Sequence, residues 1–470
     1  MSQLHFLVIS FPAQSHINPA LQFAKRLLRT GAHVTFVTSV SARRRMTKTT
    51  AIDGLIYASF SDGYDDVFLP SDDFINYMAQ LKRCSSQALT DLTLAAAANE
   101  RRPVTCIFYN FLLSWVAELA RNLQVPSAVL WIQPAALLNL YYYYFNGYSD
   151  LIHGNTNDPS FSIELPGLPL LTSKDLPSFL LPSDDNASHP HVMPFVQELF
   201  QNLEKETKAR VLVNSFEALE VEALRAIDKF SIAAIGPLIP SAFLDGKDSL
   251  DTSFGGDMMI SSSRDYMDWL NSKPEASVVY VSFGTTSVLS EDQVREIANG
   301  LLGSRRPFLW VIRPPNGKEE VEIVENMEEL KKSGMMVPWC SQVEVLCHPS
   351  IGCFVTHCGW NSTLEGLVAG VPMVMFPQWS DQATNAKLIK DVWKTGLRLD
   401  LNEEGLVEGD EIKRCVEIVM ERGESGEEMR RNAKRWKELA REAVMDGGSS
   451  DKNLQALVDE VRLIVAEPAL

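Results

Sequence analysis

The segment from Trp339 to Gln382 holds the side chains of this sequence that are best suited to do chemistry together. It begins with a tryptophan, continues through an apolar run that ends in His357, and turns at a glycine. A helix then starts at Asn361-Ser362, with Glu365 one turn further on, and the segment closes on an Asp-Gln pair. These groups suit a sugar nucleotide. They comprise an aromatic ring for stacking, a helix N-terminus, a carboxylate that can bind a diol, and a second pair that can bind hydroxyls.

The apolar run before His357 is typical of a buried parallel strand, and such strands carry ligand sites at their carboxyl ends. Backbone amides and the side chains of Asn361 and Ser362 can cradle a diphosphate there, while His357 donates to a phosphate oxygen. Glu365 can reach a ribose diol. Asn361 and Ser362 also fit a plain helix cap, but a cap does not account for Trp339, His357 and Glu365 at their spacings.

Two shorter features predict further contacts with the same ligand. A strand that ends in Gly284-Thr285 offers a hydroxyl and a backbone N–H at a turn, where a β-phosphate could bind. The closing pair combines Asp381, which can accept from two adjacent sugar hydroxyls, with Gln382, whose amide both donates and accepts.

The whole 44-residue segment resembles the donor-binding signature of plant family 1 UDP-glycosyltransferases. The resemblance implies that Trp339 stacks on uracil, that Gln342 contacts the ribose, and that Gln382 goes with glucose as the donor sugar. It implies UDP-glucose as co-substrate, no other cofactor, and transfer with inversion at the anomeric carbon. The donor-binding residues that we expect are Thr285, Trp339, Cys340, Gln342, His357, Trp360, Asn361, Ser362, Glu365, Asp381 and Gln382.

A zinc site is the main alternative to a sugar-nucleotide site in this region, because four cysteines and a histidine lie close together in the sequence. Their gaps are not the paired two-residue spacings of structural zinc sites. We therefore expect buried free thiols and no metal site. The residues concerned are Cys340, Cys347, Cys353, His357 and Cys358.

His16 is the candidate catalytic base. The sequence FPAQSHINP places it in the loop after the first strand, just before a helix that we expect to start at Asn18-Pro19. A neutral imidazole can take a proton from an acceptor hydroxyl. Enzymes of the family usually pair this histidine with an aspartate, but here Asn110 stands at that position. Its amide oxygen can orient the ring, yet it lacks the charge that stabilises an imidazolium, so we expect a weaker base.

A weak base suits an acceptor that ionises easily, such as a carboxylic acid or an activated phenol. The N-terminal half resembles the branch of the family that includes anthocyanin 5-O-glucosyltransferases and enzymes that form glucose esters. We expect an aromatic acceptor pocket, in which some of the tyrosines at 141–144 must serve only in packing. Its expected residues are His16, Trp131, Gln133, Tyr141–Tyr144, Trp379 and Ser380.

Composition narrows the class of protein. At 470 residues the chain is long enough for two domains, and its net charge of −17 argues against nucleic acid or an anionic membrane as partner. An odd number of cysteines, seven, is typical of reduced thiols, and no signal peptide is visible, so we expect a cytoplasmic monomer. The uncharged stretch 125–145 predicts a buried strand and helix rather than a membrane span.

Strand–helix alternation predicts an α/β protein with the GT-B fold, in which two facing Rossmann-like domains enclose an interdomain cleft. We place an acceptor-binding domain at 1–243, a UDP-sugar-binding domain at 244–452 with a linker at about 240–265, and a last helix at 453–470 that packs back toward the first domain. Apolar runs predict nine strands, at 5–12, 32–39, 104–110, 127–133, 209–215, 278–284, 308–313, 352–357 and 371–376.

Two other functions compete with glycosyl transfer. Asn110 makes a non-catalytic protein that binds sugar nucleotides or other small molecules conceivable. A dinucleotide-dependent oxidoreductase would also use Rossmann-like domains, but no G-x-G-x-x-G follows any of these strands.

Overall fold

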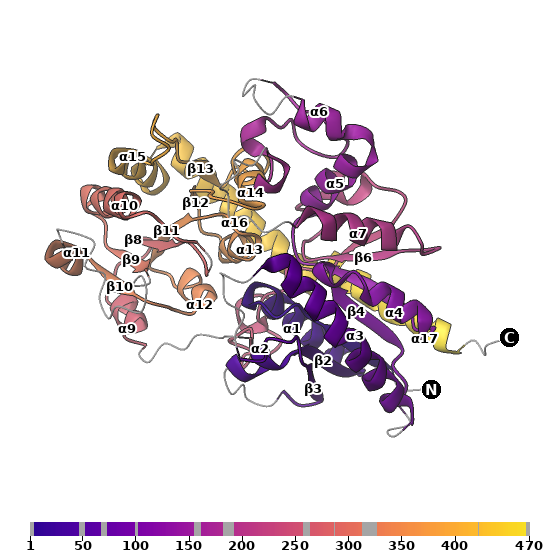
Figure 1. Ribbon diagram of the computed structural model, residues 1–470. Coiled ribbons are helices and arrows are strands. Elements are labelled where there is room, and N and C mark those ends of the chain that lie inside the picture. Colours follow the sequence, from indigo (N-terminus) through magenta and orange to yellow (C-terminus); the bar gives the residue numbers. More distant parts are fainter. Residues whose placement is uncertain are drawn as a thin grey trace.

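The computed structural model contains two parallel β-sheets, one in each half of the chain (Figure 1). It describes residues 4–46, 52–66, 73–98, 102–154, 161–181, 192–256, 264–285, 287–312, 327–421 and 423–466. The sheet orders are β3-β2-β1-β4-β5-β6-β7 and β10-β9-β8-β11-β12-β13. In each sheet the order reverses beside the first strand, which is the arrangement of a Rossmann-like fold and places the ligand crevice at that strand's carboxyl end.

The N-terminal domain carries the seven-stranded sheet. Its strands are β1 (His5–Ile9), β2 (His33–Ser39), β3 (Leu55–Phe60), β4 (Cys106–Asn110), β5 (Ser127–Trp131), β6 (Arg210–Val213) and β7 (Ser231–Ala234). Its helices are α1 (Gln14–Arg29), α2 (Val40–Arg45), α3 (Phe74–Ala98), α4 (Val116–Asn122), α5 (Ala135–Tyr143), α6 (Ser149–His153), α7 (Met193–Leu203) and α8 (Val221–Arg225).

The C-terminal domain carries the six-stranded sheet. Its strands are β8 (Val278–Ser282), β9 (Phe308–Val311), β10 (Gly334–Val337), β11 (Ile351–Thr356), β12 (Met373–Met375) and β13 (Gly396–Arg398). The helices that follow the first domain are α9 (Asp265–Asn271), α10 (Glu291–Ser304), α11 (Met327–Ser333), α12 (Gln342–Leu346), α13 (Trp360–Ala369), α14 (Gln382–Lys387), α15 (Gly409–Met420), α16 (Glu424–Val444) and α17 (Ser449–Ala466).

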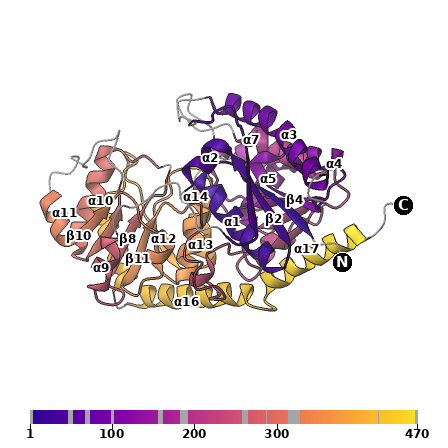
Figure 2. The ribbon, with the colours of Figure 1, turned by 90° about the horizontal axis from the view of Figure 1, so that it is seen from below.

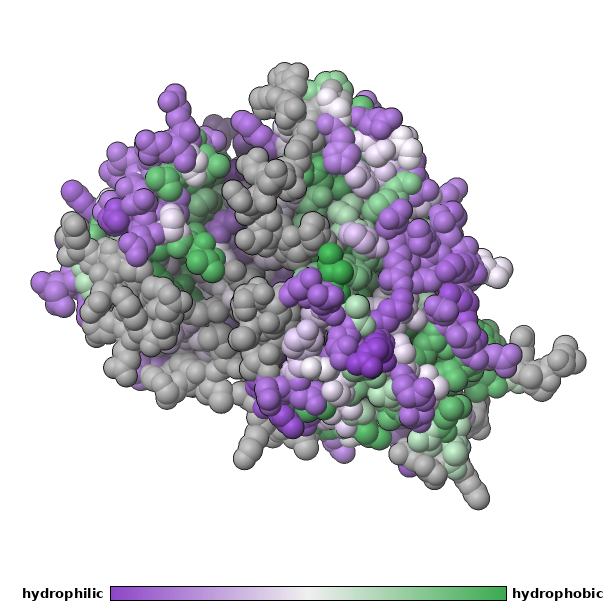
Figure 3. Space-filling model, viewed as in Figure 1, coloured by the Kyte–Doolittle hydropathy of each residue, from purple (hydrophilic) through white to green (hydrophobic). Residues whose placement is uncertain are grey.

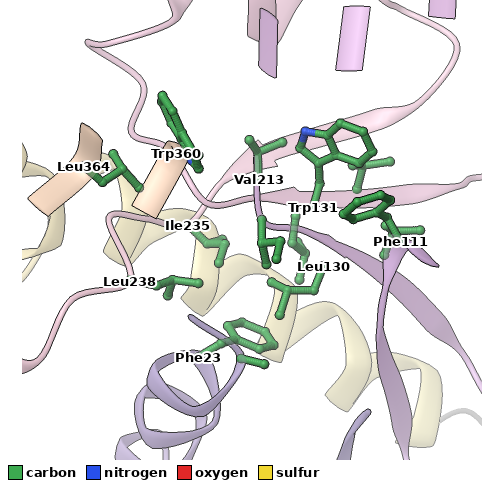
Figure 4. Packing of buried hydrophobic residues seen from close by; sticks show 14 of the residues in the cluster. Phe23, Phe111, Leu130, Trp131, Val213, Ile235, Leu238, Trp360 and Leu364 are labelled. Atoms are coloured by element: carbon green, nitrogen blue, oxygen red, sulfur yellow. The ribbon is translucent and has the colours of Figure 1, made fainter. Parts of the chain in front are cut away.

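One continuous apolar cluster joins the two domains, because it includes side chains from both sheets. Figure 4 shows part of it, where Trp360 and Leu364 of α13 lie near Val213 and Ile235 of the N-terminal domain. Such shared packing fixes the two domains against each other and so fixes the distance between residues on either side. On the face shown in Figure 3, the coloured surface is a mixture of hydrophilic residues and hydrophobic patches.

The last two helices also connect the domains. Figure 2 shows α16 running beneath the C-terminal domain and α17 continuing beneath the N-terminal domain. On α17, Ser450 donates to the Gly236 carbonyl at 2.6 Å, and Glu460 pairs with Arg210 at 2.7 Å. The chain therefore crosses back to its first domain before it ends.

Part of the expected linker belongs to the N-terminal domain. Lys25 of α1 pairs with Asp251 at 2.5 Å, and Gln22 donates to the Ser253 carbonyl at 3.2 Å. Residues 241–256 thus lie along the helix that carries His16, whereas residues 257–263 fall outside the described part of the chain. Within the described residues, no helix combines the length and apolar character that crossing a membrane requires.

The expected start of α1 at Asn18-Pro19 is wrong. The helix begins at Gln14, so His16 lies in its first turn, and Pro19 lies inside the helix. Proline has no N–H, and the Ser15 carbonyl, four residues earlier, therefore lacks its usual helical donor. Ser15 lies in the first turn of α1. A single donor from outside the helix can therefore replace the missing hydrogen bond.

Candidate active site

His16 and Asn110 meet at the carboxyl ends of the adjacent strands β1 and β4. The His16 Nδ1 lies 3.0 Å from the Asn110 Oδ1, and the same oxygen accepts from the Leu112 backbone N–H at 3.2 Å. The Leu112 N–H identifies this atom as the amide oxygen, which can only accept, so the imidazole supplies the hydrogen in the contact with Asn110. The protonated nitrogen is therefore Nδ1, which leaves Nε2 free to take a proton.

Aromatic rings enclose the base. The His16 ring centroid lies 5.1 Å from that of Phe11 and 5.8 Å from that of Phe111, which stacks on it. Burial lowers the pKa of His16 from 6.5 to about 4, and the hydrogen bond with Asn110 offsets only part of this effect. The imidazole is therefore neutral at pH 7, but it is a weak base.

Four of the expected donor residues form one hydrogen-bonded network. Gln342 Nε2 donates to the Ser362 hydroxyl at 2.8 Å and also contacts the Glu365 carboxylate. The Tyr280 hydroxyl donates to Gln342 Oε1 at 3.2 Å and lies 3.3 Å from the Cys340 sulfur. Hydrogen bonds thus join residues of β8, α12 and α13 beside the C-terminal sheet. A ribose diol could be held there.

His357 lies at the end of β11 and faces two glycines. A Cβ atom added at Gly284 or at Gly359 would lie 2.6 Å from its Nε2, so only glycine leaves room for the ring. Burial lowers the pKa of His357 to about 4 against an opposing contact with the Ser282 backbone. A neutral imidazole at the N-terminus of α13 can donate to a phosphate oxygen there.

The closing pair of the segment lies where a tight loop enters α14, with Asp381 just before the helix and Gln382 as its first residue. Gln382 Oε1 accepts from the backbone N–H of Gln378 at 2.8 Å and of Trp379 at 3.1 Å. Asp381 accepts from the Asn385 side chain at 2.8 Å. Burial raises the pKa of Asp381, whereas hydrogen bonds from Asn385 and Ser380 lower it.

One hydrogen bond connects the donor motif to the base. Asn361 Nδ2 of α13 donates to the Ser15 carbonyl at 2.8 Å, the carbonyl that Pro19 leaves without a helical donor. Ser15 directly precedes His16 in the chain. The carboxyl ends of β1 and β11 therefore face each other across the domain border.

Other expected residues lie in packing positions. Trp360 is buried, donates its indole N–H to the Asn214 carbonyl at 2.8 Å, and packs on Trp393. Trp131 is fully buried, donates to the Pro134 carbonyl, and supports Phe111 at a centroid distance of 4.8 Å (Figure 4). These side chains pack at the domain border and beside the ring next to His16, and their expected contacts with a ligand stay predictions.

The tyrosines also pack within the N-terminal domain. Tyr141 and Tyr143 are buried, and Tyr143 donates to the Ala226 carbonyl at 3.2 Å. Tyr142 contacts Phe200 and Phe230 edge to face, whereas Tyr144 bonds to His153. Trp339 and Trp379 are half-buried at the C-terminal side, and Thr285 is exposed in the turn after β8.

Several buried polar atoms near these residues have no hydrogen-bond partner within the described part of the chain. They are Asn110 Nδ2, Gln133 Oε1, His357 Nδ1 and Gln378 Nε2. Buried polar groups are almost always paired, so these four atoms are candidates for hydrogen bonds with a ligand. By contrast, two hollows of about 620 and 600 Å³ on the C-terminal domain contain none of the expected site residues.

Sequence patterns missed three residues of this site. Tyr280 looks like one more apolar position in a buried strand. Only its hydroxyl group could have indicated that it takes part in the site. Gln378 and Ser287, whose side chains bond to each other, lie in loops far apart in the sequence. Their pairing joins the turn after β8 to the closing loop, which no local pattern could reveal.

The cysteines are free thiols, as the sequence predicts, and five of the seven are buried. Burial raises the pKa of Cys340 to about 12, so this thiol is neutral at pH 7. Among the described residues, no group of three or more His, Cys, Asp or Glu side chains could hold a metal ion.

Comparison with known proteins decides the family. Residues 195–431 match the family described as UDP-glucoronosyl and UDP-glucosyl transferase. The chain belongs to plant family 1 of the UDP-glycosyltransferases. It is therefore an enzyme, and the resemblance of its 44-residue segment is confirmed.

Relatives match this UDP-glycosyltransferase along its whole length. Phloretin 4'-O-glucosyltransferase of Malus domestica is 58% identical, with 99% of each chain covered. Anthocyanidin 3-O-glucoside 5-O-glucosyltransferase of Verbena hybrida is 54% identical, with 98% of this chain and 99% of the relative covered. Crocetin glucosyltransferase of Gardenia jasminoides, named as chloroplastic, is 57% identical over 98% of both chains.

A solved structure confirms the expected GT-B fold. The crystal structure of Os79 from O. sativa in complex with UDP has a TM-score of 0.83 and 33% sequence identity. The match covers 97% of this chain and all of Os79. The two Rossmann-like sheets thus belong to an architecture that binds UDP in that neighbour.

Replacing Glu365 with alanine should weaken UDP binding by about five- to thirty-fold, since it removes a contact of roughly 1–2 kcal/mol. Replacing His357 with alanine should do the same through the diphosphate. Titration calorimetry with UDP measures both effects. Glu417→Ala, on the outer helix α15, is a matched control that should leave the affinity unchanged. Wild-type affinity in both site variants would mean that UDP does not bind at this network.

Proposed function

We propose that this enzyme transfers glucose from UDP-glucose, with inversion at the anomeric carbon, to a hydroxyl or carboxyl group of a small plant metabolite. UDP is the leaving group. The donor would lie on the C-terminal domain against Trp339, the Gln342 network and the N-terminus of α13. The acceptor would lie on the N-terminal side, next to His16.

The observation that carries the proposal is the contact between Asn361 and Ser15, because it joins the two halves of the reaction. It brings the helix N-terminus that would hold the diphosphate next to the turn that carries the base. In such an arrangement, His16 Nε2 removes a proton from the acceptor as the new bond forms. The α13 N-terminus and His357 then stabilise the negative charge that develops on the departing UDP.

The weak base supports an acceptor that ionises readily. With a pKa of about 4, His16 is a poor match for an aliphatic alcohol. A carboxylate needs no base at neutral pH, and a phenol in a conjugated system loses its proton more easily than an alcohol. Relatives named for phloretin, anthocyanidin 3-O-glucosides and crocetin make conjugated aromatic or polyene compounds the first candidates.

The direct test is UDP release from UDP-glucose with a panel of acceptors. The panel contains flavonoids, simple phenols, aliphatic alcohols and aromatic or aliphatic carboxylic acids. We expect acceptor-dependent UDP release that favours phenols and carboxylates. If UDP-glucose binds but no acceptor releases UDP, the protein is a non-catalytic binder of sugar nucleotides.

UDP-glucose should outperform UDP-galactose and UDP-glucuronate as donor. Asp381 and Gln382 offer a carboxylate and an amide for adjacent hydroxyls, and the 44-residue segment contains no arginine to pair with a uronate. Competition of the three donors at equal concentration, with the products separated by mass, measures the preference. A clear preference for galactose or glucuronate would contradict this assignment.

The cellular location and oligomeric state belong to the same proposal. We propose a cytoplasmic monomer with no cofactor besides the UDP-sugar, supported by seven free thiols. One relative is named as chloroplastic, so plastid import is the alternative to test. A fluorescent fusion in leaf cells distinguishes the compartments, and light scattering of the purified protein gives the mass in solution.

A further inference from the structure

Residues 172–180 of the N-terminal domain, here called the docking segment, lie against the C-terminal domain beside the closing loop 378–382. They include the short helices η3 (Ser173–Asp175) and η4 (Ser178–Leu180). Their neighbours across the border are α14 and β13, and α14 follows the loop that carries Asp381. In Figure 1, α14 lies at the border between the two domains.

Asp175 anchors this segment. The residue is 6% exposed, and its carboxylate lies 3.2 Å from Arg398 of β13 and 3.6 Å from Lys387 of α14. Its backbone carbonyl accepts from the Thr384 hydroxyl at 2.7 Å. A buried carboxylate that faces two cations is held firmly, because its charge would be costly without them.

Ser178 makes two hydrogen bonds with the backbone of Ser380 in the closing loop. The Ser380 N–H donates to the Ser178 hydroxyl at 2.8 Å, and the Ser178 N–H donates to the Ser380 carbonyl at 2.9 Å. Next to this pair, the Phe179 and Trp379 rings meet edge to face at 6.2 Å. The backbone of Ser380 is therefore fixed by the other domain.

Ser380 needs such support. Its φ is +61°, in the left-handed region that residues with a side chain rarely adopt. Strained residues of this kind persist only where surrounding contacts hold them. Ser380 directly precedes Asp381 in the chain, so the position of its backbone affects the carboxylate expected to bind sugar hydroxyls.

We propose that Ser178 is a positioning residue for the donor sugar: the docking segment of the acceptor domain holds Ser380, and Ser380 sets the place of Asp381 and Gln382. This inference rests on the proposed function, since it assumes that these two residues bind the glucose of UDP-glucose. The acceptor domain thereby takes part in recognising the sugar, while the nucleotide is held by the C-terminal domain alone.

Two ligands that differ only in the sugar separate these roles. Titration calorimetry with UDP and with UDP-2-fluoro-glucose, which resists transfer, gives one affinity for each. In Ser178→Ala, the UDP-2-fluoro-glucose affinity should fall about three- to ten-fold while the UDP affinity stays unchanged. Ser178→Thr keeps the hydroxyl and should restore the wild-type value.

Ser450→Ala is the matched control. It removes a hydroxyl that also bonds to the backbone across the domain border, in this case by donating to the Gly236 carbonyl, but far from the closing loop in sequence and in contacts. Both affinities should stay at the wild-type level. Equal affinities in Ser178→Ala and wild type would overturn the inference, and so would an equal loss for UDP and the sugar nucleotide.

The outcomes also distinguish this inference from the proposed function. If the wild type transfers glucose but Ser178→Ala behaves like it in both titrations, only the positioning role fails. If the wild type neither transfers glucose nor binds UDP-2-fluoro-glucose, the proposed function fails first. With UDP-glucose as substrate, Ser178→Ala should raise KM for the donor more than it changes KM for the acceptor.

Discussion

Replacing His16 with alanine should lower kcat/KM for a phenolic acceptor by roughly 10²- to 10⁴-fold, the usual contribution of general base catalysis. The loss should be far smaller with a carboxylate acceptor, whose oxygen is already a free nucleophile at neutral pH. The measurement is kcat/KM for the wild type and His16→Ala with one phenol and one carboxylic acid. The comparison between acceptors matters more than either value alone.

A histidine control and a binding control complete this experiment. His348→Ala removes a partly exposed imidazole on the C-terminal domain, which bonds to Ser350, and should change neither rate. UDP affinity in His16→Ala should equal that of the wild type, because no expected UDP contact is lost. Intact phenol glucosylation in His16→Ala would show that this histidine is not the base.

The pH dependence has a definite sign. Activity requires neutral His16, and its pKa lies near 4 rather than 6.5. With a phenol, the wild-type rate should therefore stay level as the pH falls from 7 to about 5 and decline only near 4, as the ring takes up a proton. An acid limb near 6.5 instead would mean that the base titrates as an ordinary exposed histidine.

The sequence predicted the inner strands of both sheets and missed the outer ones. The nine apolar runs correspond to β1, β2, β4, β5, β6, β8, β9, β11 and β12. The four missed strands, β3, β7, β10 and β13, are the edges of the two sheets. An edge strand has a partner on one side only and is partly exposed here, so its apolar run is shorter or interrupted.

Local contacts could be predicted, and contacts between distant segments could not. The cap of α10, outside the site, is an example of the first kind, because a serine followed three residues later by glutamine is typical of a helix start, and the Gln293 N–H donates to the Ser290 hydroxyl. The pairing of Ser178 with Ser380 is an example of the second, because 202 residues separate them. Trp360 is a second example, because its indole N–H bonds to Asn214 of the opposite domain, 146 residues away, while its expected contact with the donor stays a prediction.

Replacing Asn110 with aspartate should strengthen the base. The new carboxylate would keep the contacts of Oδ1 with His16 and with the Leu112 N–H. It would also put a charged oxygen where Asn110 Nδ2 now lies buried with no partner among the described residues. An opposite charge at this distance raises the pKa of an imidazole by roughly 1–3 units, which corresponds to a roughly 10- to 10³-fold gain in proton affinity.

That gain should appear only where the acceptor needs a base. For Asn110→Asp, kcat/KM with a weakly acidic phenol should rise by roughly 10-fold or more, and its acid limb should move upward from about 4, because the imidazolium is stabilised. The rate with a carboxylate should not rise, since no proton is removed. Asn110→Ala separates charge from orientation, and it should slow phenol transfer because the ring loses its only observed acceptor at Nδ1 within the described residues. If Asn110→Asp leaves both the phenol rate and the acid limb unchanged, then another group already stabilises the imidazolium, and the weakness of His16 does not explain the choice of acceptor.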